Sequence, residues 1–179
     1  MEQVNWFDRK FEFSFEQNIF PSIMERLRGT SIRLNHKIAQ IPTEHLTVKL
    51  EGKWSIQENI GHLIDLEPVW QGRLEDILNG TGYLRMADLE NKKTDLANHN
   101  EGEIKTLLSE FQNLRKSTLE NLKLLSEKEV YKYALHPRLK TPMRIMDLFL
   151  FVAEHDDHHL ARISELNKLL TTPCKNNNG

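Results

Sequence analysis

The sequence predicts an all-α protein that folds as a four-helix bundle, for three reasons. Four segments carry apolar residues at steps of three, four or seven, which is the spacing of one face of an α-helix. No stretch of useful length alternates apolar and polar residues as a half-buried strand does. The chain has 179 residues, which suits one domain; we expect residues 1–170 to form it and residues 171–179 to be a disordered tail.

The first helix is predicted to follow an N-terminal arm. Residues 1–17 are rich in Phe and Trp, and we expect them to pack on the bundle as this arm. The helix then begins at Phe20-Pro21, because proline suits the first turn of a helix, and Pro42 ends it.

The second helix is predicted between Ser55 and Asn79-Gly80. Ser55 and Glu58 have the spacing of a capping box, in which each side chain binds the backbone N–H of the other residue. A glycine after the last apolar residue is a common helix end. Pro68 lies inside this segment and is expected to bend the helix, since proline removes one backbone hydrogen bond.

The third and fourth helices are also predicted from their start signals. The third is expected to begin near Asn100, because Glu103 stands at the capping-box spacing from it. The fourth is expected to begin at Thr141-Pro142, an N-cap and first-turn pair, and to run to about Leu170.

A long connection separates the second helix from the third. Residues 79–99 number about twenty and can span about 65 Å when extended. A helix of about twenty residues is only about 30 Å long. The connection can therefore cross the whole bundle and leave the second and third helices parallel. Long connections often have a function, so we also expect it to cover a site.

The composition excludes several classes of protein. With 24 Lys+Arg against 26 Asp+Glu, the chain lacks the basic excess of a nucleic-acid binder. No apolar run approaches the roughly 18–20 residues of a membrane span, and the N-terminus lacks the layout of a signal peptide. The single Cys174 cannot form an internal disulfide, which fits a reducing compartment. We therefore expect a cytoplasmic protein that binds neither nucleic acid nor membrane.

Two histidines in the fourth predicted helix are candidate metal ligands. On a helical wheel centred on Val152, His159 lies about 20° and His155 about 60° from the centre, on the same side. His158 lies about 120° away, towards solvent. The spacing i, i+4 lets the first two imidazoles converge on one ion. An equally weighted alternative is a pair of core histidines with their own hydrogen-bond partners.

The second helix offers a histidine and a carboxylate. On a wheel centred on Ile56, His62 lies about 120° away, so the pattern alone does not turn it inward. Glu67 lies about 20° from the centre and could hold an imidazole or act as a general acid or base. Pairing of Glu67 with an Arg or Lys, or its displacement by the bend at Pro68, is weighted equally. Asp156, about 40° off centre in the fourth helix, is a weaker candidate of the same kind.

Two motifs resemble the DinB-like (YfiT-like) superfamily of metal-binding four-helix bundles. Residues 54–63 read Trp-Ser-Ile-Gln-Glu-Asn-Ile-Gly-His-Leu, and residues 151–160 read Phe-Val-Ala-Glu-His-Asp-Asp-His-His-Leu. The segment 136–143, His-Pro-Arg-Leu-Lys-Thr-Pro-Met, is also similar to a DinB subgroup.

The resemblance implies a metal site and a topology. By motif, the ligands are His62, His155 and His159, the ion is nickel or zinc, and there is one ion per chain. The implied bundle runs up-down-down-up, and the implied assembly is a homodimer. The family often has Gln-Ile after its paired histidines, where this chain has Leu160-Ala161-Arg162-Ile163, so Arg162 is a candidate for a difference in specificity.

The implied chemistry is that of a metal-dependent enzyme. Three neutral imidazoles leave coordination positions open, as in catalytic sites. Relatives include bacillithiol S-transferases and mycothiol-dependent maleylpyruvate isomerases, so our first hypothesis is a transferase that uses a low-molecular-weight thiol as cosubstrate. In it, Glu67 or Asp156 orients a ligand or moves a proton. The alternatives are a hydrolase that uses metal-bound water and a non-catalytic metal-binding stress-response protein.

Four residues of the long connections are candidates to line a pocket beside the metal. They are Tyr83, His99, His136 and Arg138. For each of the four, the favoured interpretation is that it is an ordinary loop residue without such a role.

Overall fold

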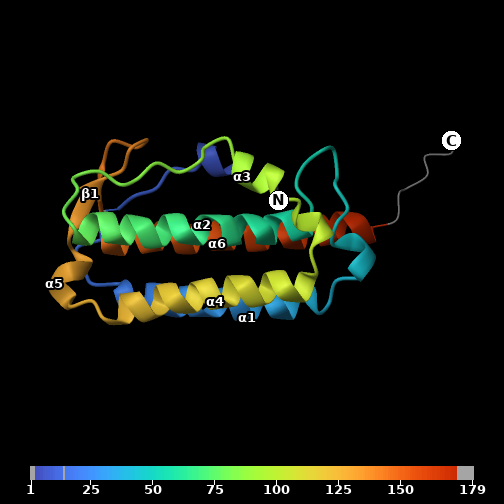
Figure 1. The fold of residues 1–179 in the computed structure, drawn as a ribbon, viewed down its shortest axis with the longest axis horizontal. Helices are drawn as coiled ribbons and strands as arrows, with labels where there is room; N and C mark the ends of the chain where they lie inside the picture. Colours follow the sequence, from blue (N-terminus) through green and yellow to red (C-terminus); the bar gives the residue numbers. More distant parts are fainter. Residues whose placement is uncertain (1–2, 14, 173–179) are drawn as a thin grey trace.

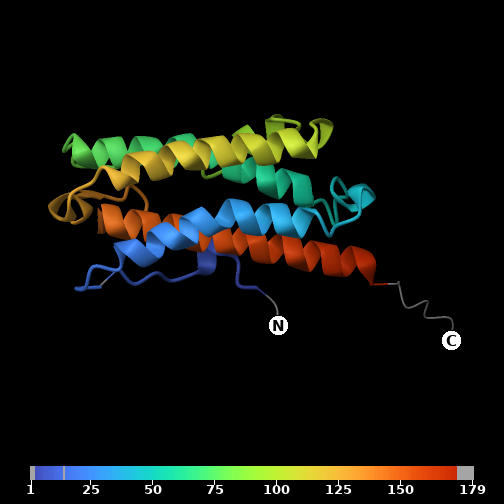
Figure 2. The same cartoon turned by 90° about the horizontal axis from the view of Figure 1, so that it is seen from below.

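Four long helices form the bundle in the computed structural model, which describes residues 3–13 and 15–172. They are α1 (Phe20–Ile38), α2 (Ile56–Leu78), α4 (Ile104–Lys123) and α6 (Ile145–Thr171). Helices α4 and α6 each pack against both α1 and α2, so α1 and α2 lie diagonally opposite (Figure 1, Figure 2). Helices α2 and α4 run in one direction, and α1 and α6 run in the other (Figure 1). The predicted up-down-down-up bundle is therefore confirmed.

The connection between α2 and α4 makes this topology possible. It runs back along the outside of α2 and carries the short helix α3 (Lys92–Leu96) and a 3-10 turn, η3 (His99–Glu101) (Figure 1). Both α3 and η3 pack against α2. The chain thus returns to the end of the bundle where α2 began, and α4 starts there, as the length of the connection predicts.

A short hairpin is the main element that the sequence does not predict. Strand β1 (Tyr133–Leu135) pairs antiparallel with β2 (Pro142–Arg144), with Ala134 opposite Met143. Each strand has three residues, which is too short for a period of two to be recognised. The short helix α5 (Glu127–Val130) precedes the hairpin, and η1 (Trp6–Asp8) and η2 (Thr43–His45) are single 3-10 turns.

The predicted start of α2 is confirmed, whereas that of α4 is displaced. Ser55 accepts a hydrogen bond from the N–H of Glu58, whose carboxylate accepts one from the N–H of Ser55. Helix α4 begins only at Ile104, because extended backbone at Gly102 separates it from η3. Asn100 therefore does not cap α4; its side-chain oxygen accepts a hydrogen bond from the hydroxyl of Ser55.

The start of α6 is also different from the prediction. Pro142 lies in β2, where it pairs with Leu135 and leaves no role for Thr141 as an N-cap. Arg144 is the residue before the helix, and its N–H and guanidinium both donate to the carboxylate of Asp147. Pairing with β1 thus takes three residues from the predicted helix.

The apolar core has two parts, one towards each end of the bundle. One cluster includes Phe20, Trp70 and Phe149, and the other includes Leu34, Ile60 and Ile163. The N-terminal arm packs on the first cluster through the side chains of Trp6, Phe11 and Phe13. Thr171, the first residue of the predicted tail 171–179, is the last residue of α6, and residues 173–179 lie outside the described residues. No helix in the described ranges is long and apolar enough to cross a membrane.

A buried polar layer separates the two apolar clusters. At its centre, Arg115 of α4 is 2% exposed and forms ion pairs with Glu67 of α2 and Asp156 of α6. Its guanidinium also donates to the backbone carbonyl of Leu27 in α1, at 3.4 Å. One side chain thus binds three other helices.

Two threonines complete this layer. Thr118 of α4 donates to Glu67 at 2.6 Å, and Thr30 of α1 donates to Asp156 at 2.7 Å. Burial raises the pKa of Glu67, and the charge of Arg115 acts in the opposite direction. Every group of the network therefore has a partner at mid-bundle, where an unpaired charge would be costly.

We expect Arg115→Met to destabilise the protein by about 3–5 kcal/mol, because it leaves two carboxylates buried without their cation. Urea unfolding at neutral pH measures this change. The triple variant Arg115→Met, Glu67→Leu, Asp156→Leu should regain most of the lost stability, since an apolar layer needs no counter-ion.

Lys116→Met is the matched control for this prediction. Lys116 is the next residue of α4 and its side chain is 73% exposed, so its loss should change the free energy of unfolding by no more than about 0.5 kcal/mol. If Arg115→Met lowers the free energy of unfolding as little as the control does, the ionic layer does not stabilise the bundle as predicted.

Candidate metal centre

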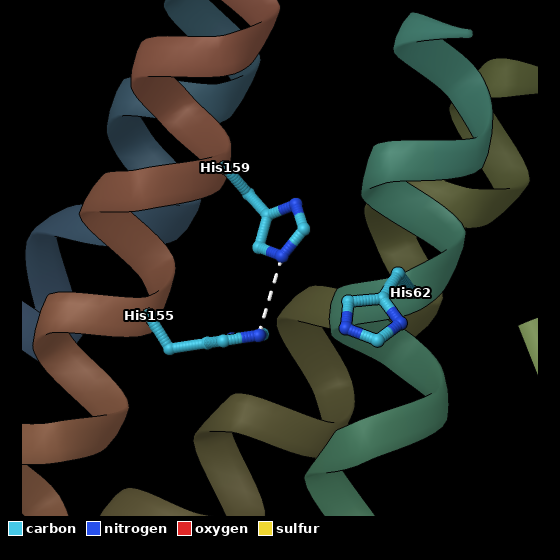
Figure 3. A group of neighbouring side chains, drawn as sticks. All are labelled: His62, His155 and His159. Carbon is cyan, nitrogen blue, oxygen red and sulfur yellow. Dashed lines mark hydrogen bonds between the residues drawn. The ribbon is translucent and has the colours of Figure 1, made fainter. Parts of the chain in front are cut away.

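Three histidines from two helices converge beside the polar layer. His62 projects from α2, and His155 and His159 project from successive turns of α6 (Figure 3). One ring nitrogen from each lies within 4.8 Å of the other two, and all three side chains are buried. The structure therefore brings together the three histidines that the sequence motifs select.

The position of His62 explains why its wheel angle was ambiguous. The three rings lie at the edge of the α2–α6 contact and not on the axis of the bundle, so a residue about 120° from the centre of the apolar face can reach them. The indole of Trp54, just before α2, covers His62 with ring centroids 4.6 Å apart. Helix α3 and the rest of the connection then bury this outer face of α2.

Hydrogen bonds orient two of the imidazoles. The side-chain nitrogen of Asn59 donates to the carbonyl of Ser55, which leaves its oxygen to accept from Nδ1–H of His159 at 2.8 Å. Thr94 donates to the carboxylate of Asp65, so its oxygen accepts from Nδ1–H of His62 at 3.0 Å. In both rings the proton is therefore on Nδ1, and the lone pair of Nε2 is free to bind a cation.

His155 has no such partner. Its Nε2 lies 3.2 Å from Nε2 of His159, and its Nδ1 is buried without a hydrogen bond in the described part of the chain. Either tautomer of His155 leaves one buried polar nitrogen unsatisfied. The three rings are thus not a closed set of hydrogen-bonded core histidines, and their free lone pairs could hold a divalent cation.

The electrostatic environment keeps the imidazoles neutral. Burial lowers the pKa of His62 to about 4, although the nearby carboxylate of Asp65 opposes the shift. Burial also lowers the pKa values of His155 and His159 well below 6.5, and the neighbouring histidines add to the effect. At neutral pH all three are unprotonated, which is the form that binds metal.

The two carboxylates named from the sequence lie next to this cluster, bound to another partner. Glu67 and Asp156 both pair with Arg115. Neither makes a hydrogen bond to an imidazole of the cluster among the described residues. Pairing of Glu67 with an arginine is one of the two alternatives that the sequence left open. A catalytic role of either acid stays a prediction.

The histidine cluster opens on a cavity of about 880 Å³. The cavity lies between the outer face of α2 and α6, the N-terminal arm and the connection 87–95. Aromatic side chains form much of its apolar wall, among them Trp6, Trp54, Trp70 and Phe151. This volume is at the upper end of the roughly 300–1,000 Å³ that small-molecule sites have.

Four residues whose role could not be decided from the sequence line this cavity. His136 and Arg138 reach it from the loop of the hairpin, and His158 and Arg162 reach it from α6. His99 is not among the lining residues; its Nε2 lies 2.9 Å from the carboxylate of Asp65. Tyr83 is 58% exposed and is also absent from the described lining.

Sequence reasoning missed Asn59, Thr94 and Arg73. Asn59 stands three residues before His62, a spacing that places both on one face of α2 and could have identified it. Arg73 also lines the cavity and follows Trp70 at the same spacing. Thr94 comes from the connection, and no local pattern predicts which helical residue it contacts.

Comparison with known proteins gives one family and one fold. The sequence model of the DinB superfamily matches residues 26–163. YfiT from Bacillus subtilis, described as a probable metal-dependent hydrolase with an unusual four-helix bundle topology, is similar in structure with a TM-score of 0.77. The two chains are 21% identical, and the match covers 90% of this chain and 93% of YfiT. No curated protein sequence matches the chain.

We expect His136 to make the stability of the protein depend on pH. Burial, together with the charges of Arg73 and Arg138, lowers the pKa of His136 to about 4. Between pH 4 and 6.5 the unfolded chain therefore binds more protons at this residue than the folded chain. The resulting stabilisation, up to about 3 kcal/mol, is present above pH 6.5 and is lost as the pH falls towards 4.

The variant His136→Asn tests this prediction. Nδ1 of His136 accepts hydrogen bonds from the backbone N–H groups of Arg138 and Leu139, and the side-chain oxygen of asparagine can take its place without titrating. Urea unfolding at pH 7 and pH 4.5, with a chelator present, should show a smaller pH dependence in the variant. Equal pH dependence in both proteins would contradict the prediction.

Proposed function

The chain belongs to the DinB superfamily, and from this premise we propose that it is a metal-dependent enzyme acting on small molecules. His62, His155 and His159 would hold one divalent ion per chain, nickel or zinc. The observation that carries the proposal is the convergence of three buried, neutral imidazoles at the wall of a large cavity. A site with three neutral ligands keeps positions open for a reactant, unlike a closed structural site.

The proposed chemistry is the activation of a nucleophile. A divalent ion in this position supplies positive charge that favours the ionised form of a thiol or of water. The residues of the chain fix the three nitrogens: Asn59 orients His159, and Thr94 orients His62. We propose that Glu67 and Asp156 are positioning residues, which act through Arg115 to hold α2 and α6 in register.

Transfer of a low-molecular-weight thiol is our first candidate reaction. The cavity is large enough for two small reactants, and its indole and phenyl walls suit an apolar electrophile. In the reaction the thiol gives its proton to solvent, and its sulfur forms a bond to an electrophilic carbon. The bond from that carbon to the leaving group breaks, and the leaving group departs with the electron pair.

Hydrolysis is the second candidate, and the description of YfiT favours it. In this reaction the oxygen of a water molecule forms a bond to the acyl carbon of an ester or amide. The bond to the alcohol or amine breaks, and this leaving group takes up a proton from the water. The homodimer, the cytoplasmic location and the limits of the domain stay predictions.

We expect protein purified without a metal-binding tag, loaded with nickel or zinc and dialysed, to retain about one ion per chain. The double variant His155→Ala, His159→Ala should retain none, because a single imidazole cannot hold the ion against dialysis. Elemental analysis with parallel protein quantitation measures both. His36→Ala is the matched control, since His36 is an exposed residue of α1 away from the cavity. The site assignment fails if the double variant and the control retain equal amounts of metal.

We expect the loaded protein to conjugate a thiol to an electrophile faster than the double variant does. Glutathione, bacillithiol and L-cysteine, each with monochlorobimane, provide a fluorescent readout, and nitrophenyl esters provide the hydrolytic one. Metal-dependent ester cleavage without thiol conjugation would replace the first candidate with the second. Metal binding without either activity on any substrate of the panel would favour the non-catalytic alternative.

A further inference from the structure

One end of the cavity is lined by basic side chains. Arg73 lies eleven residues after His62 on α2, which corresponds to about 16 Å along the helix axis. His136 and Arg138, from the loop of the hairpin, line the cavity with Arg73. The cavity extends between the histidine cluster and these three residues, and Trp70 separates them: its ring packs edge-on against His155 and lies under the guanidinium of Arg73.

Arg73 is a buried cation with no carboxylate in direct contact among the described residues. It is 2% exposed and forms no ion pair with any described carboxylate. Its Nε donates to the backbone carbonyl of Arg85 at 3.1 Å, and its guanidinium stacks on the ring of Trp70. Asp76, three residues further along α2, raises the pKa of Arg73 through its charge and so opposes burial, but its hydrogen bonds go to the side chain of Arg85. A buried guanidinium without an anion is costly, so this arrangement calls for one from outside the chain.

His136 directs a second donor to the same place. Its Nδ1 accepts two backbone N–H groups, so the proton of the neutral ring is on Nε2. This Nε2–H lies 3.3 Å from Nη1 of Arg73, which is also a donor. Two buried donors this close offer each other no acceptor, and an oxygen atom beside the pair, within hydrogen-bond distance of both, satisfies them.

The acids of the cavity do not supply that acceptor. Glu165 pairs with Arg162, and Asp95 accepts a hydrogen bond from the indole of Trp54. Glu90 pairs with Lys92 on the exposed connection, and Asp88 accepts backbone N–H groups there. Arg138 forms no ion pair with a described residue either, and its guanidinium lies over the ring of Phe7.

We propose that Arg73, His136 and Arg138 form a carboxylate-binding subsite, and that the substrate is an elongated small molecule with a carboxylate at the end opposite to its reacting group. The placement of the reacting group rests on the proposed function; the subsite itself does not. A carboxylate is planar and presents two oxygens, which matches the fork of a guanidinium. A phosphate dianion is less suited, because the last turn of α2, with its negative dipole end, begins just after Arg73.

The test compares octanoate with its neutral counterpart octanamide on chelator-treated protein by titration calorimetry. The wild-type protein should bind octanoate at least about tenfold more tightly than octanamide, since charge-assisted hydrogen bonds contribute about 1.5–3 kcal/mol. Arg73→Met should abolish this preference, and Arg138→Met, at a half-buried position of the hairpin loop, should reduce it. Arg28→Met, at a 43% exposed arginine of α1 outside the cavity, is the matched control and should keep it.

The outcomes for the carboxylate subsite and for the proposed metal-dependent function can be told apart. The double variant His155→Ala, His159→Ala should keep the preference for octanoate; if it does so while wild-type protein retains no metal, the subsite stands and the proposed function falls. Equal binding of octanoate and octanamide by the wild-type protein, or no binding of either, would overturn the subsite whatever the metal content. A preference for octanoate that survives in both Arg73→Met and Arg138→Met would also overturn the subsite. Tighter binding of octyl phosphate than of octanoate would overturn the assignment to a carboxylate.

Discussion

The buried guanidinium of Arg115 holds all four long helices together at the middle of the bundle. It binds a carboxylate on α2, a carboxylate on α6 and a backbone carbonyl on α1. Apolar layers tolerate small shifts between helices, whereas this ionic layer is satisfied in one register only. Because Asp156 directly follows His155 and Glu67 lies five residues after His62, the register set by Arg115 also sets the positions of the two helices that carry the histidine cluster.

The site that results lies on the outside of the bundle and depends on segments that are not part of it. The N-terminal arm places Trp6 with its ring 4.9 Å from that of His155, and Arg9 anchors the arm to Glu154 at 2.6 Å. On the other side, the connection supplies Thr94, which fixes the tautomer of His62. The bundle therefore provides the ligands, and the two covering segments provide the walls and the orientation.

This division explains what the sequence could and could not predict. The long helices and the pair His155 and His159 follow from a period of 3.6 residues, which is a local property of the chain. The inward direction of His62 required the family resemblance, because it depends on how α3 and the connection cover α2. The hairpin was missed because its three-residue strands are too short for an alternation of apolar and polar residues to be recognised. The contact of Arg73 with His136 was missed because it joins residues that are 63 positions apart in the sequence.

The two most buried arginines of the chain differ in a way that bears on function. Arg115 and Arg73 are each 2% exposed, yet the first has two carboxylate partners and the second has none in the described ranges. Burial lowers the pKa of Arg73 to about 10, whereas two adjacent carboxylates outweigh burial and raise the pKa of Arg115. Arg115 is thus stabilised by the fold itself, and its charge is already neutralised. The charge of Asp76 offsets only part of the desolvation cost of Arg73. A bound anion removes more of that cost, so the burial that weakens the free protein strengthens its binding of a carboxylate.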